Sequence, residues 1–463
     1  MTDASQLIPN SMAVSSDCLY NLKPSSVPGR VYRASIPTSN KSTFNPSDVA
    51  VLYIPAGRRN TFLDPTQSYL KFCIQNYDTN NAISCDNNAS CVINRLDTFS
   101  GSNLLETVQQ KNVLYSYLVD FQMSFAARYG ASSMYGTADV ATAAGLRSGA
   151  TLNAATSSSA PNKLTVCMPV LSSVFGLGAD KLVPIGLLGD DLRVEVSFEQ
   201  HLLGMVYAST NGTQVPWQIT SVELELAIVE LSDQGMSMVN SVTPFNAPIY
   251  LHGNGYRHYA SSLPANISGT YSTLVPARFA SLKQLIALPR RATEISSATS
   301  YSLTSRVNPN ILNYWWRVGP YLIPNKPVTL SSTSGNVGGY AEAYMEIIRS
   351  QHALSHVDSG ACISFDEFNV QDAAADTTVT SVGISTVNTG ANSFKNAFAI
   401  AQELEMWAMR SDVIISGMNT LSSQVFFEAT IGATAPTTAY TVDFYANFDV
   451  IFILENGLLS ARY

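Results

Sequence analysis

Side chains able to perform chemistry are few in this sequence, and two histidines come closest to a recognisable arrangement. His352 and His356 are four residues apart in a segment with helical periodicity, residues 339–356, which places both imidazoles on one helix face, as a metal pair requires. No Glu follows His352, so the H-E-x-x-H pattern of zinc proteases is absent. We therefore interpret both as ordinary residues near a helix end and predict no metal site.

Four carboxylates are close enough in sequence to act as an acid and a base: Asp190, Asp191, Glu195 and Glu199. General acid-base catalysis of glycoside hydrolysis needs such a pair across a cleft. Here, however, the acidic residues alternate with apolar residues over 192–198, the period of a strand with one buried face. The alternation favours a solvated strand face over a catalytic pair.

Aromatic side chains form the most conspicuous binding candidate. Tyr314, Trp315, Trp316 and Tyr321, with Arg317 between them, are of the types that stack on bases or sugars. The chain is acidic, and Arg317 has no basic residues around it. We favour the interpretation that this cluster packs a domain or subunit interface.

Calcium and disulfide chemistry find little support. Residues 78–81 (Asp-Thr-Asn-Asn) begin like an oxygen-rich loop but lack the spaced acids and final Glu of an EF-hand, so a turn is expected. The six cysteines are too sparse for a disulfide framework and form no C-x-x-C pair. Cys85 and Cys91 flank an Asn-rich loop and are the pair that a bridge would join; we interpret all six as small core residues.

Enzyme motifs with a known mechanism are absent. The sequence has no G-x-x-x-x-G-K-[ST] phosphate loop, no G-x-G-x-x-G and no G-x-S-x-G nucleophile elbow. We therefore predict that the protein is not an enzyme, with no catalytic, cofactor-binding or metal-binding residues and no cofactor.

Composition points to a surface that is covered by partners. Charged residues make up 13% of the 463 residues, about half the usual share, and the net charge is -8. A surface poor in Lys and Glu is typical of protein that is buried between neighbours. The acidic net charge argues against nucleic-acid binding. No stretch is apolar enough for a transmembrane segment. The first residues lack a secretory signal, so we expect synthesis in the host cytosol.

Strict alternation of apolar and polar residues predicts a mainly β protein of antiparallel sandwiches. Residues 70–74, 192–198, 222–228 and 446–454 show it most clearly. Helical periodicity is limited to about 103–128, 339–356 and 393–410. Pro and Ser without periodicity predict an extended N-terminal arm over 1–45, and a turn-like linker near residue 234 divides two domains of similar plan, 46–234 and 235–463.

Several strings, in order along residues 50–463, resemble a known family, the double jelly-roll major capsid proteins of small eukaryotic double-stranded DNA viruses, namely polinton-like viruses, adintoviruses and virophages. The strings are residues 183–196 (a Pro-containing turn into a strand), 219–231, 277–285 with Arg290 and Arg291, 316–328, 340–354, 415–420 and 443–454. They are patterns of fold packing rather than chemical signatures.

The resemblance implies two tandem eight-stranded antiparallel jelly rolls with a few short helices in loops. It further implies a homotrimer that forms a pseudo-hexameric capsomer, and trimers that tile an icosahedral shell around a double-stranded DNA genome. Expected partners are neighbouring trimers, penton proteins and minor capsid proteins, without sequence-specific nucleic-acid binding. The expected location is the virion, after assembly in the host cytoplasm or nucleus.

Three other functions remain open on the sequence. A coat protein of a positive-strand RNA virus fits the strands, although a polybasic arm is missing: the arm carries a net charge of only about +2. A secreted or surface carbohydrate-binding β-sandwich would use Trp315 and Trp316 as its platform. A glycoside hydrolase would need the carboxylate pair discussed above.

Overall fold

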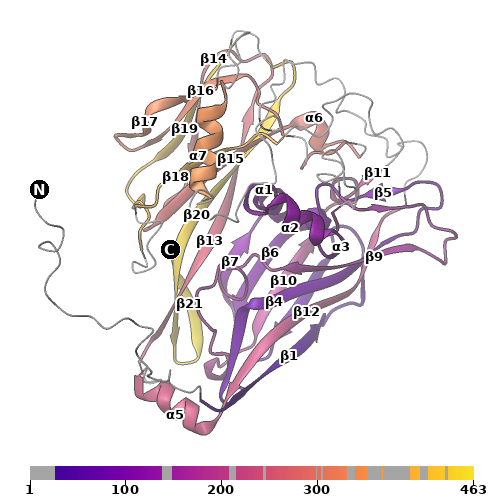
Figure 1. Ribbon diagram of the computed structural model, residues 1–463, viewed down its shortest axis with the longest axis vertical. Helices are drawn as coiled ribbons and strands as arrows, with labels where there is room; N and C mark the ends of the chain where they lie inside the picture. Colours follow the sequence, from indigo (N-terminus) through magenta and orange to yellow (C-terminus); the bar gives the residue numbers. More distant parts are fainter. Residues whose placement is uncertain are drawn as a thin grey trace, which may run out of the picture.

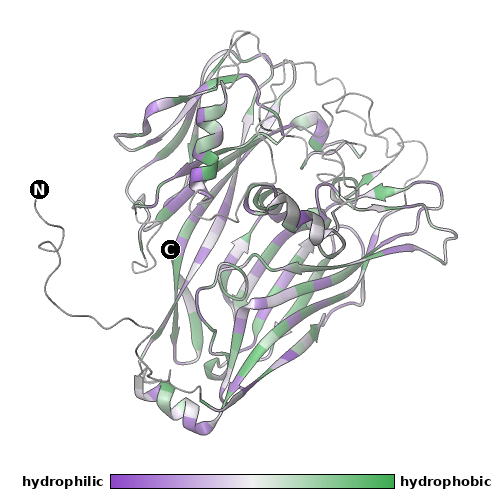
Figure 2. Cartoon of the chain, in the orientation of Figure 1, coloured by the Kyte–Doolittle hydropathy of each residue, from purple (hydrophilic) through white to green (hydrophobic). Residues whose placement is uncertain are grey.

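The strands of the protein follow the alternation seen in its sequence. In β10 (Leu192–Phe198) of the computed structural model, every second residue from Leu192 to Phe198 is buried and the residues between are partly exposed. Figure 2 shows the same change from apolar to polar along many strands. The structure describes residues 27–137, 149–207, 215–242, 247–298, 300–303, 306–330, 339–351, 368, 397–406, 415–432 and 436–463.

Two antiparallel sheets form the first half of the molecule. One has the order β1-β12-β4-β9, with β2 also paired to β12, and the other has the order β3-β10-β6-β7. The strands are β1 (Gly29–Pro37), β2 (Thr43–Phe44), β3 (Val49–Ile54), β4 (Thr61–Asn76), β6 (Ile93–Ser100), β7 (Asn103–Val108), β9 (Asn162–Pro169), β10 and β12 (Gln218–Leu231).

The second half repeats this arrangement. Its sheets have the orders β13-β20-β15-β18, with β21 also paired to β20, and β14-β19-β16-β17. The strands are β13 (Ile249–Leu263), β14 (Gly269–Val275), β15 (Leu282–Arg291), β16 (Ile311–Val318), β17 (Tyr321–Thr329), β18 (Ile400–Glu403), β19 (Val425–Ile431), β20 (Tyr440–Glu455) and β21 (Leu458–Arg462).

Both halves share one topology. Without the short β2, β5, β8, β11 and the terminal β21, each half has eight strands; numbered in chain order, they pair as first-eighth-third-sixth in one sheet and second-seventh-fourth-fifth in the other. Two four-stranded sheets with crossed connections are the pattern of a jelly roll. The expectation of two tandem eight-stranded rolls is confirmed, and we call them the first and second roll.

Connections between strands carry the helices and one small sheet. The small sheet has the order β11-β5-β8, from β5 (Ile83–Ser84), β8 (Thr151–Leu152) and β11 (Val206–Tyr207). The helices are α1 (Lys111–Gln122), α2 (Phe125–Gly130), α3 (Ser132–Tyr135), α4 (His201–Gly204), α5 (Asp233–Val242), α6 (Ala292–Ile295) and α7 (Ala341–Ser350), with 3-10 turns at Ala89–Val92 and Ile185–Leu187. Among the described residues, no helix is both long and apolar enough to cross a bilayer.

Two of the three predicted helices need correction. The helix predicted over 103–128 begins only at Lys111, because Asn103–Val108 forms β7 and pairs with β6. Within the segment predicted as a helix over 393–410, Ile400–Glu403 is strand β18, paired with β15. In both places tertiary pairing decides over local periodicity. The helix predicted over 339–356 is present over its central part as α7 (Ala341–Ser350), and residues 352–356 lie outside the described residues.

The N-terminal segment is more ordered than its composition suggests. Residues 29–37 fall within the predicted arm 1–45, yet they form β1, which pairs with β12 in an unbroken register from Gly29↔Leu231 to Pro37↔Glu223. β1 begins beside α5, where the Ser232 N–H donates to the Pro28 carbonyl (3.0 Å). Figure 1 shows α5 at one end of the molecule, between the two rolls in sequence. The domain limits at 45 and 234 stay predictions.

Candidate functional site: the seam between the rolls

The second roll presses the outer face of its β13-β20-β15-β18 sheet against the first roll, and we call this contact the seam. The Tyr445 hydroxyl, on β20, donates to the Gln110 carbonyl at 2.8 Å, and the Tyr463 hydroxyl donates to the Leu105 carbonyl of β7. The first roll therefore contributes β7 and the start of α1 to the seam. Figure 1 shows α1 lying between the rolls.

Backbone groups also meet across the seam. The Asn254 N–H donates to the Gly178 carbonyl (2.7 Å), and Ala179 and Gly253 form a β-bridge. Glycine is required here: a Cβ on Gly253 would lie 2.5 Å from the Ser173 carbonyl oxygen, and one on Gly178 would lie 2.4 Å from that of Asn254. Two backbones at this spacing fix the relative position of the rolls.

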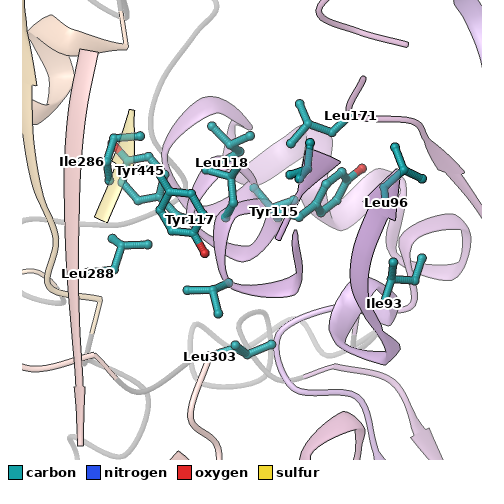
Figure 3. Close-up of a cluster of buried hydrophobic side chains, with 14 of the residues drawn as sticks. Ile93, Leu96, Tyr115, Tyr117, Leu118, Leu171, Ile286, Leu288, Leu303 and Tyr445 are labelled. Carbon is teal, nitrogen blue, oxygen red and sulfur yellow. The ribbon is translucent and has the colours of Figure 1, made fainter. Parts of the chain in front are cut away.

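Helix α1 is buried on all sides from Lys111 to Phe121 because it lies between the rolls. In Figure 3, Tyr117 and Leu118 lie toward the second roll, whereas the Tyr115 ring lies toward Leu171 and Leu96 of the first. The residues that the second roll places near α1 are Ile286, Leu288, Leu303 and Tyr445. The amphipathic helix predicted from the sequence is thus an internal one, with two different apolar neighbours.

A buried carboxylate ties α1 to both rolls. Asp120 accepts from Arg128 (2.7 Å) in α2 of the first roll and from Arg306 (2.6 Å) of the second. Asn87 also donates to Asp120 (3.1 Å) and accepts from Arg128 (2.8 Å). The exposed fractions of the three charged side chains are at most 1%. Removing a partner from such a group leaves a buried charge uncompensated, so each partner is needed in place.

Two groups of the same chemistry lie on the seam face of the second roll. His258 contacts Asp443 at 2.8 Å, and Arg290 pairs with the same carboxylate at 2.8 Å. Burial opposes ionisation of Asp443, but the Arg290 charge and the His258 hydrogen bond outweigh it and hold the Asp443 pKa below its usual value.

The second group repeats this one six residues along β20. His252 contacts Asp449 at 2.9 Å, Lys283 lies 3.6 Å from the same carboxylate, and the Ser281 hydroxyl donates to it. Burial again opposes ionisation, and the His252 and Ser281 hydrogen bonds together with Lys283 lower the Asp449 pKa. These pairs join three adjacent strands of the second roll on its seam face, whereas the Asp120–Arg306 pair crosses from one roll to the other.

Comparison with known proteins gives no sequence match: no protein-family model and no curated protein matches the chain. Solved structures do match. PBCV-1 VP54, fitted into a cryo-EM reconstruction of the virophage Sputnik, aligns with a TM-score of 0.59 and 8% identity over 96% of this chain and 99% of that chain. A chain of the Sputnik virophage solved by cryo-EM gives 0.57 and 13% over 98% and 93%. The mavirus major capsid protein gives 0.54 and 9% over 98% and 95%.

These alignments span both rolls and the connections between them. The chain has the double jelly-roll fold. The resemblance inferred from the sequence strings is thereby confirmed at the level of fold, although identities of 8–13% leave no string of side chains to compare.

Within the double jelly roll, the aromatic candidates lie in two environments: Tyr314 and Trp316 are buried, whereas Tyr321 is 67% exposed. Trp316 is fully buried and packs against Phe427 and Phe444, with ring centroids 4.9 and 5.9 Å away. The Trp315 indole N–H donates to Glu428 at 2.6 Å, and Arg317 pairs with the same carboxylate at 2.8 Å. Trp316 therefore packs in the core of the second roll, and the predicted packing at a domain or subunit interface is wrong for this residue.

The carboxylate candidates divide into two environments. Asp190 and Asp191 are exposed, and Glu195 pairs with Arg193 of the same strand (3.1 Å), as expected for a solvated face. For Glu199 that expectation is wrong: it is 4% exposed and accepts from Asn94 and Asn112. Glu199 follows the end of β10, where the chain turns inward toward α1, so the strand period no longer applies.

The remaining candidates are also structural where they are described. Asp78 accepts from the N–H groups of Asn80 and Asn81, which makes the predicted turn. Cys85 and Cys91 are buried free thiols, and burial raises the Cys91 pKa well above its usual value. His352 and His356 lie outside the described residues. Within the described ranges, no three His, Cys, Asp or Glu side chains are grouped as a metal site.

Sequence reasoning missed the seam residues. Asp443 and Asp449 occupy the polar positions of an alternating strand, and this pattern is typical of a face in water. His252 and His258 on β13 alternate in the same way. The one available signal was the scarcity of Lys and Glu in the whole sequence, which indicates covered surface but does not say which face is covered.

Proposed function

We propose that the protein is a major capsid protein: three chains associate into a pseudo-hexameric capsomer, and capsomers tile an icosahedral shell around a double-stranded DNA genome. The double jelly-roll fold, shared with the mavirus major capsid protein, supports this function. The observation that carries it is the seam itself, because the chain has a second copy of each side of that contact, and the two copies do not contact each other within the described part of the chain.

The first unmatched surface is the outer face of the β1-β12-β4-β9 sheet, which we call the open face. It occupies the position in the first roll that the buried seam face occupies in the second. The open face carries Val31, 66% exposed, and the ion pairs Arg33–Glu225 and Lys71–Glu223. In the second roll the corresponding face is covered by β7 and α1.

The second unmatched surface is β17 with the exposed face of α7. These elements follow one another in the second roll as β7 and α1 do in the first. Tyr321 is 67% exposed, Leu322 44% and Met345 48%, so large apolar groups lie on this surface. Apolar and aromatic groups of this size are enriched at the centres of protein interfaces.

A contact between these two surfaces on different copies would repeat the seam. In Figure 1, β17 lies at the upper left edge of the chain and β1 at the lower right, so the surfaces face away from each other. A head-to-tail contact of this kind forms a closed ring when its rotation divides a full turn. Three copies supply six rolls, which corresponds to the pseudo-hexameric outline.

Partners and location follow from the same proposal. The first described residue, Val27, lies beside α5 at one end of the rolls, and we assign the contacts with minor capsid and penton proteins to the N-terminal arm. The net charge of -8 favours a shell that forms before the genome enters it, without sequence-specific contacts to nucleic acid. The mature protein is then located in the virion.

Sedimentation velocity and negative-stain electron microscopy of the protein expressed alone test the proposal. A trimer of three times 49.9 kDa, about 150 kDa, with a six-sided outline is expected. The double variant Tyr321→Glu with Leu322→Glu should give a folded monomer, whereas the matched control Leu421→Glu, an exposed leucine outside both surfaces, should remain a trimer. A wild-type monomer would contradict the proposal and make binding to immobilised sugars the next measurement.

A further inference from the structure

The seam closes the free edge of a β-sheet at one place. β13 is an edge strand of the second roll, and the connection between β9 and β10 of the first roll pairs with it. The Asn254 N–H donates to the Gly178 carbonyl (2.7 Å), and the Asp180 N–H donates to the His252 carbonyl (3.3 Å). This short pairing is antiparallel, so Asp180 lies opposite His252. An edge strand presents unpaired backbone groups, and here the other roll satisfies two of them.

β1 is the counterpart of β13, but its outer edge has no such pairing among the described residues. Each is the first strand of its roll and lies at the end of its sheet, next to β12 or β20. Within the described part of the chain, β1 pairs with β12 alone, and no backbone hydrogen bond reaches its other edge. Val31 and Arg33, near the start of this edge, are exposed. In this part of the chain, the first roll thus has an open edge where the second roll has a closed one.

The register of β1 identifies the backbone groups that point outward. Just beyond the paired residues, the Ser232 N–H donates to the Pro28 carbonyl, so Pro28 points toward β12. Successive residues of an antiparallel strand point their N–H and C=O groups to alternate sides. Because the register is unbroken, the even-numbered residues of β1 bond to β12 and the odd-numbered residues point outward. The Val31 carbonyl and the Arg33 N–H can therefore bond outside the sheet, as their counterparts in β13 do.

The second roll contains a counterpart of Asp180 in the connection between β18 and β19. This connection has the same place in its roll as the one between β9 and β10 has in the first. Each connection forms one bridge with two hydrogen bonds to the third strand of its roll: Val183 with Leu63, and Met418 with Leu282. Asp180 lies three residues before Val183, and Ile415 lies three residues before Met418. Ile415 is therefore the residue that corresponds to Asp180.

Ile415 is free to make the contact that Asp180 makes. Its side chain is 49% exposed, and its N–H donates to no group in the described part of the chain. Val31 lies in the other roll, and no described hydrogen bond joins the two residues. Both side chains are aliphatic and exposed, so a contact between them would remove apolar surface from water in addition to forming the backbone hydrogen bond.

We propose that the open edge of β1 pairs with the connection between β18 and β19 of a second copy. The Ile415 N–H of one copy donates to the Val31 carbonyl of the next, and the two side chains lie opposite each other. This inference rests on the proposed function, because it names residues that join neighbouring chains in the head-to-tail trimer. Three such contacts close all three β1 edges of a ring, which also keeps these edges from pairing with unrelated strands.

Disulfide formation in the double variant Val31→Cys with Ile415→Cys tests the pairing. Residues of a hydrogen-bonded antiparallel pair have Cα atoms about 5.5 Å apart, which is within the range that a disulfide spans. After mild oxidation, non-reducing electrophoresis should show the 49.9 kDa chain shifted to about 100 and 150 kDa, without larger species because the ring is closed. Each single variant and the wild type should remain at 49.9 kDa.

A matched control keeps one thiol and moves the other. Val31→Cys with Leu421→Cys places the second thiol six residues later in the same connection, at a side chain that is 50% exposed, and it should not cross-link. Sedimentation velocity of the wild type and of the reduced double variant separates this inference from the proposed function. Trimers that give no disulfide, or a control that cross-links equally, would overturn the edge pairing alone. A wild-type monomer would overturn both proposals.

Discussion

The two five-stranded sheets of the molecule have the same strand order but opposite surroundings. On the open face of the first roll, the exposed fraction is 67% for Arg33 and 36% for Lys71. On the seam face of the second roll, the exposed fraction is 6% for Arg290 and 2% for Asp443. The two faces thus differ mainly in their cations: each open-face pair keeps its cation in contact with water, although Glu225, the partner of Arg33, is only 3% exposed, whereas both partners of Arg290–Asp443 are buried.

This difference shows that the neighbours of a sheet, rather than its topology, decide what its polar residues do. An exposed ion pair gains little, because water screens the charges and the long side chains lose freedom. A buried pair costs desolvation and depends on every partner. The seam face meets this requirement with two carboxylates, each of which contacts a histidine and a cation, whereas the buried carboxylate of the open face, Glu225, pairs with the exposed Arg33.

The largest effect is expected where both rolls depend on one carboxylate. Asp120→Ala should lower the free energy of unfolding by about 3–5 kcal/mol, because Arg128 and Arg306 lose the charge that both face. Chemical denaturation of purified protein measures it. Asp233→Ala removes a carboxylate that is 77% exposed and pairs with Arg59, and it should leave stability close to wild type. A small effect of Asp120→Ala would mean that the rolls do not depend on this cluster.

The next variant compares the two equivalent sheets directly. Asp443→Asn on β20 keeps the shape but removes the charge that Arg290 faces, and it should cost about 2–4 kcal/mol. Glu223→Gln on β12, the corresponding strand, removes the partner of Lys71 and should be within experimental error of wild type. Equal losses in thermal unfolding would show that burial does not separate the two faces.

Acid should weaken the carboxylate pairs on the seam face of the second roll. Asp443 and Asp449 have pKa values below those of an unfolded chain, so their contribution to stability is complete above about pH 4 and is lost as the pH falls through the folded-state values. Melting temperatures recorded from about pH 6 to pH 3 should fall less steeply for Asp443→Asn than for wild type. Parallel curves for the two proteins would contradict this prediction.

The smallest effect is expected at Glu403, and it has the opposite sign. Burial raises its pKa to about 7, so the folded state holds a proton that the unfolded chain has already released, and stability falls as the pH rises from about 4.5 through 7. Glu403→Gln should therefore gain stability relative to wild type at about pH 8 but not at about pH 4. Differential scanning calorimetry at both values measures the gain.

Much of the fold was predictable from the sequence, because a strand with one buried face alternates apolar and polar residues. The alternation over 192–198 and 446–454 corresponds to β10 and part of β20. The segment 103–108 lies within a stretch of helical periodicity, yet it forms a strand that pairs with residues of β6. Pairing partners are distant in sequence, so a local pattern cannot contain them.

The seam was not predictable for a related reason. Asp443 and Asp449 follow the same alternating pattern as residues in contact with water, and the sequence does not say that another roll lies over them. For Trp316 the sequence predicted packing at a domain or subunit interface, but its partners Phe427 and Phe444 belong to the same roll, so it is a core residue. Whether a polar face is in water depends on how two domains dock. The sequence of one domain does not show which of its faces the other domain covers.

The position of β12 and β20 at the end of each roll has a consequence for synthesis. The β1-β12-β4-β9 sheet and the β13-β20-β15-β18 sheet are each complete only when β12 or β20 has left the ribosome. The first roll can therefore fold after residue 231, whereas the second roll cannot fold before residues 440–455 have been made. At 5–20 residues per second, the intervening 440 − 231 = 209 residues take roughly 10–40 s. During that interval α1 of the nascent chain has only one of its two apolar neighbours, which makes it a natural target for chaperones.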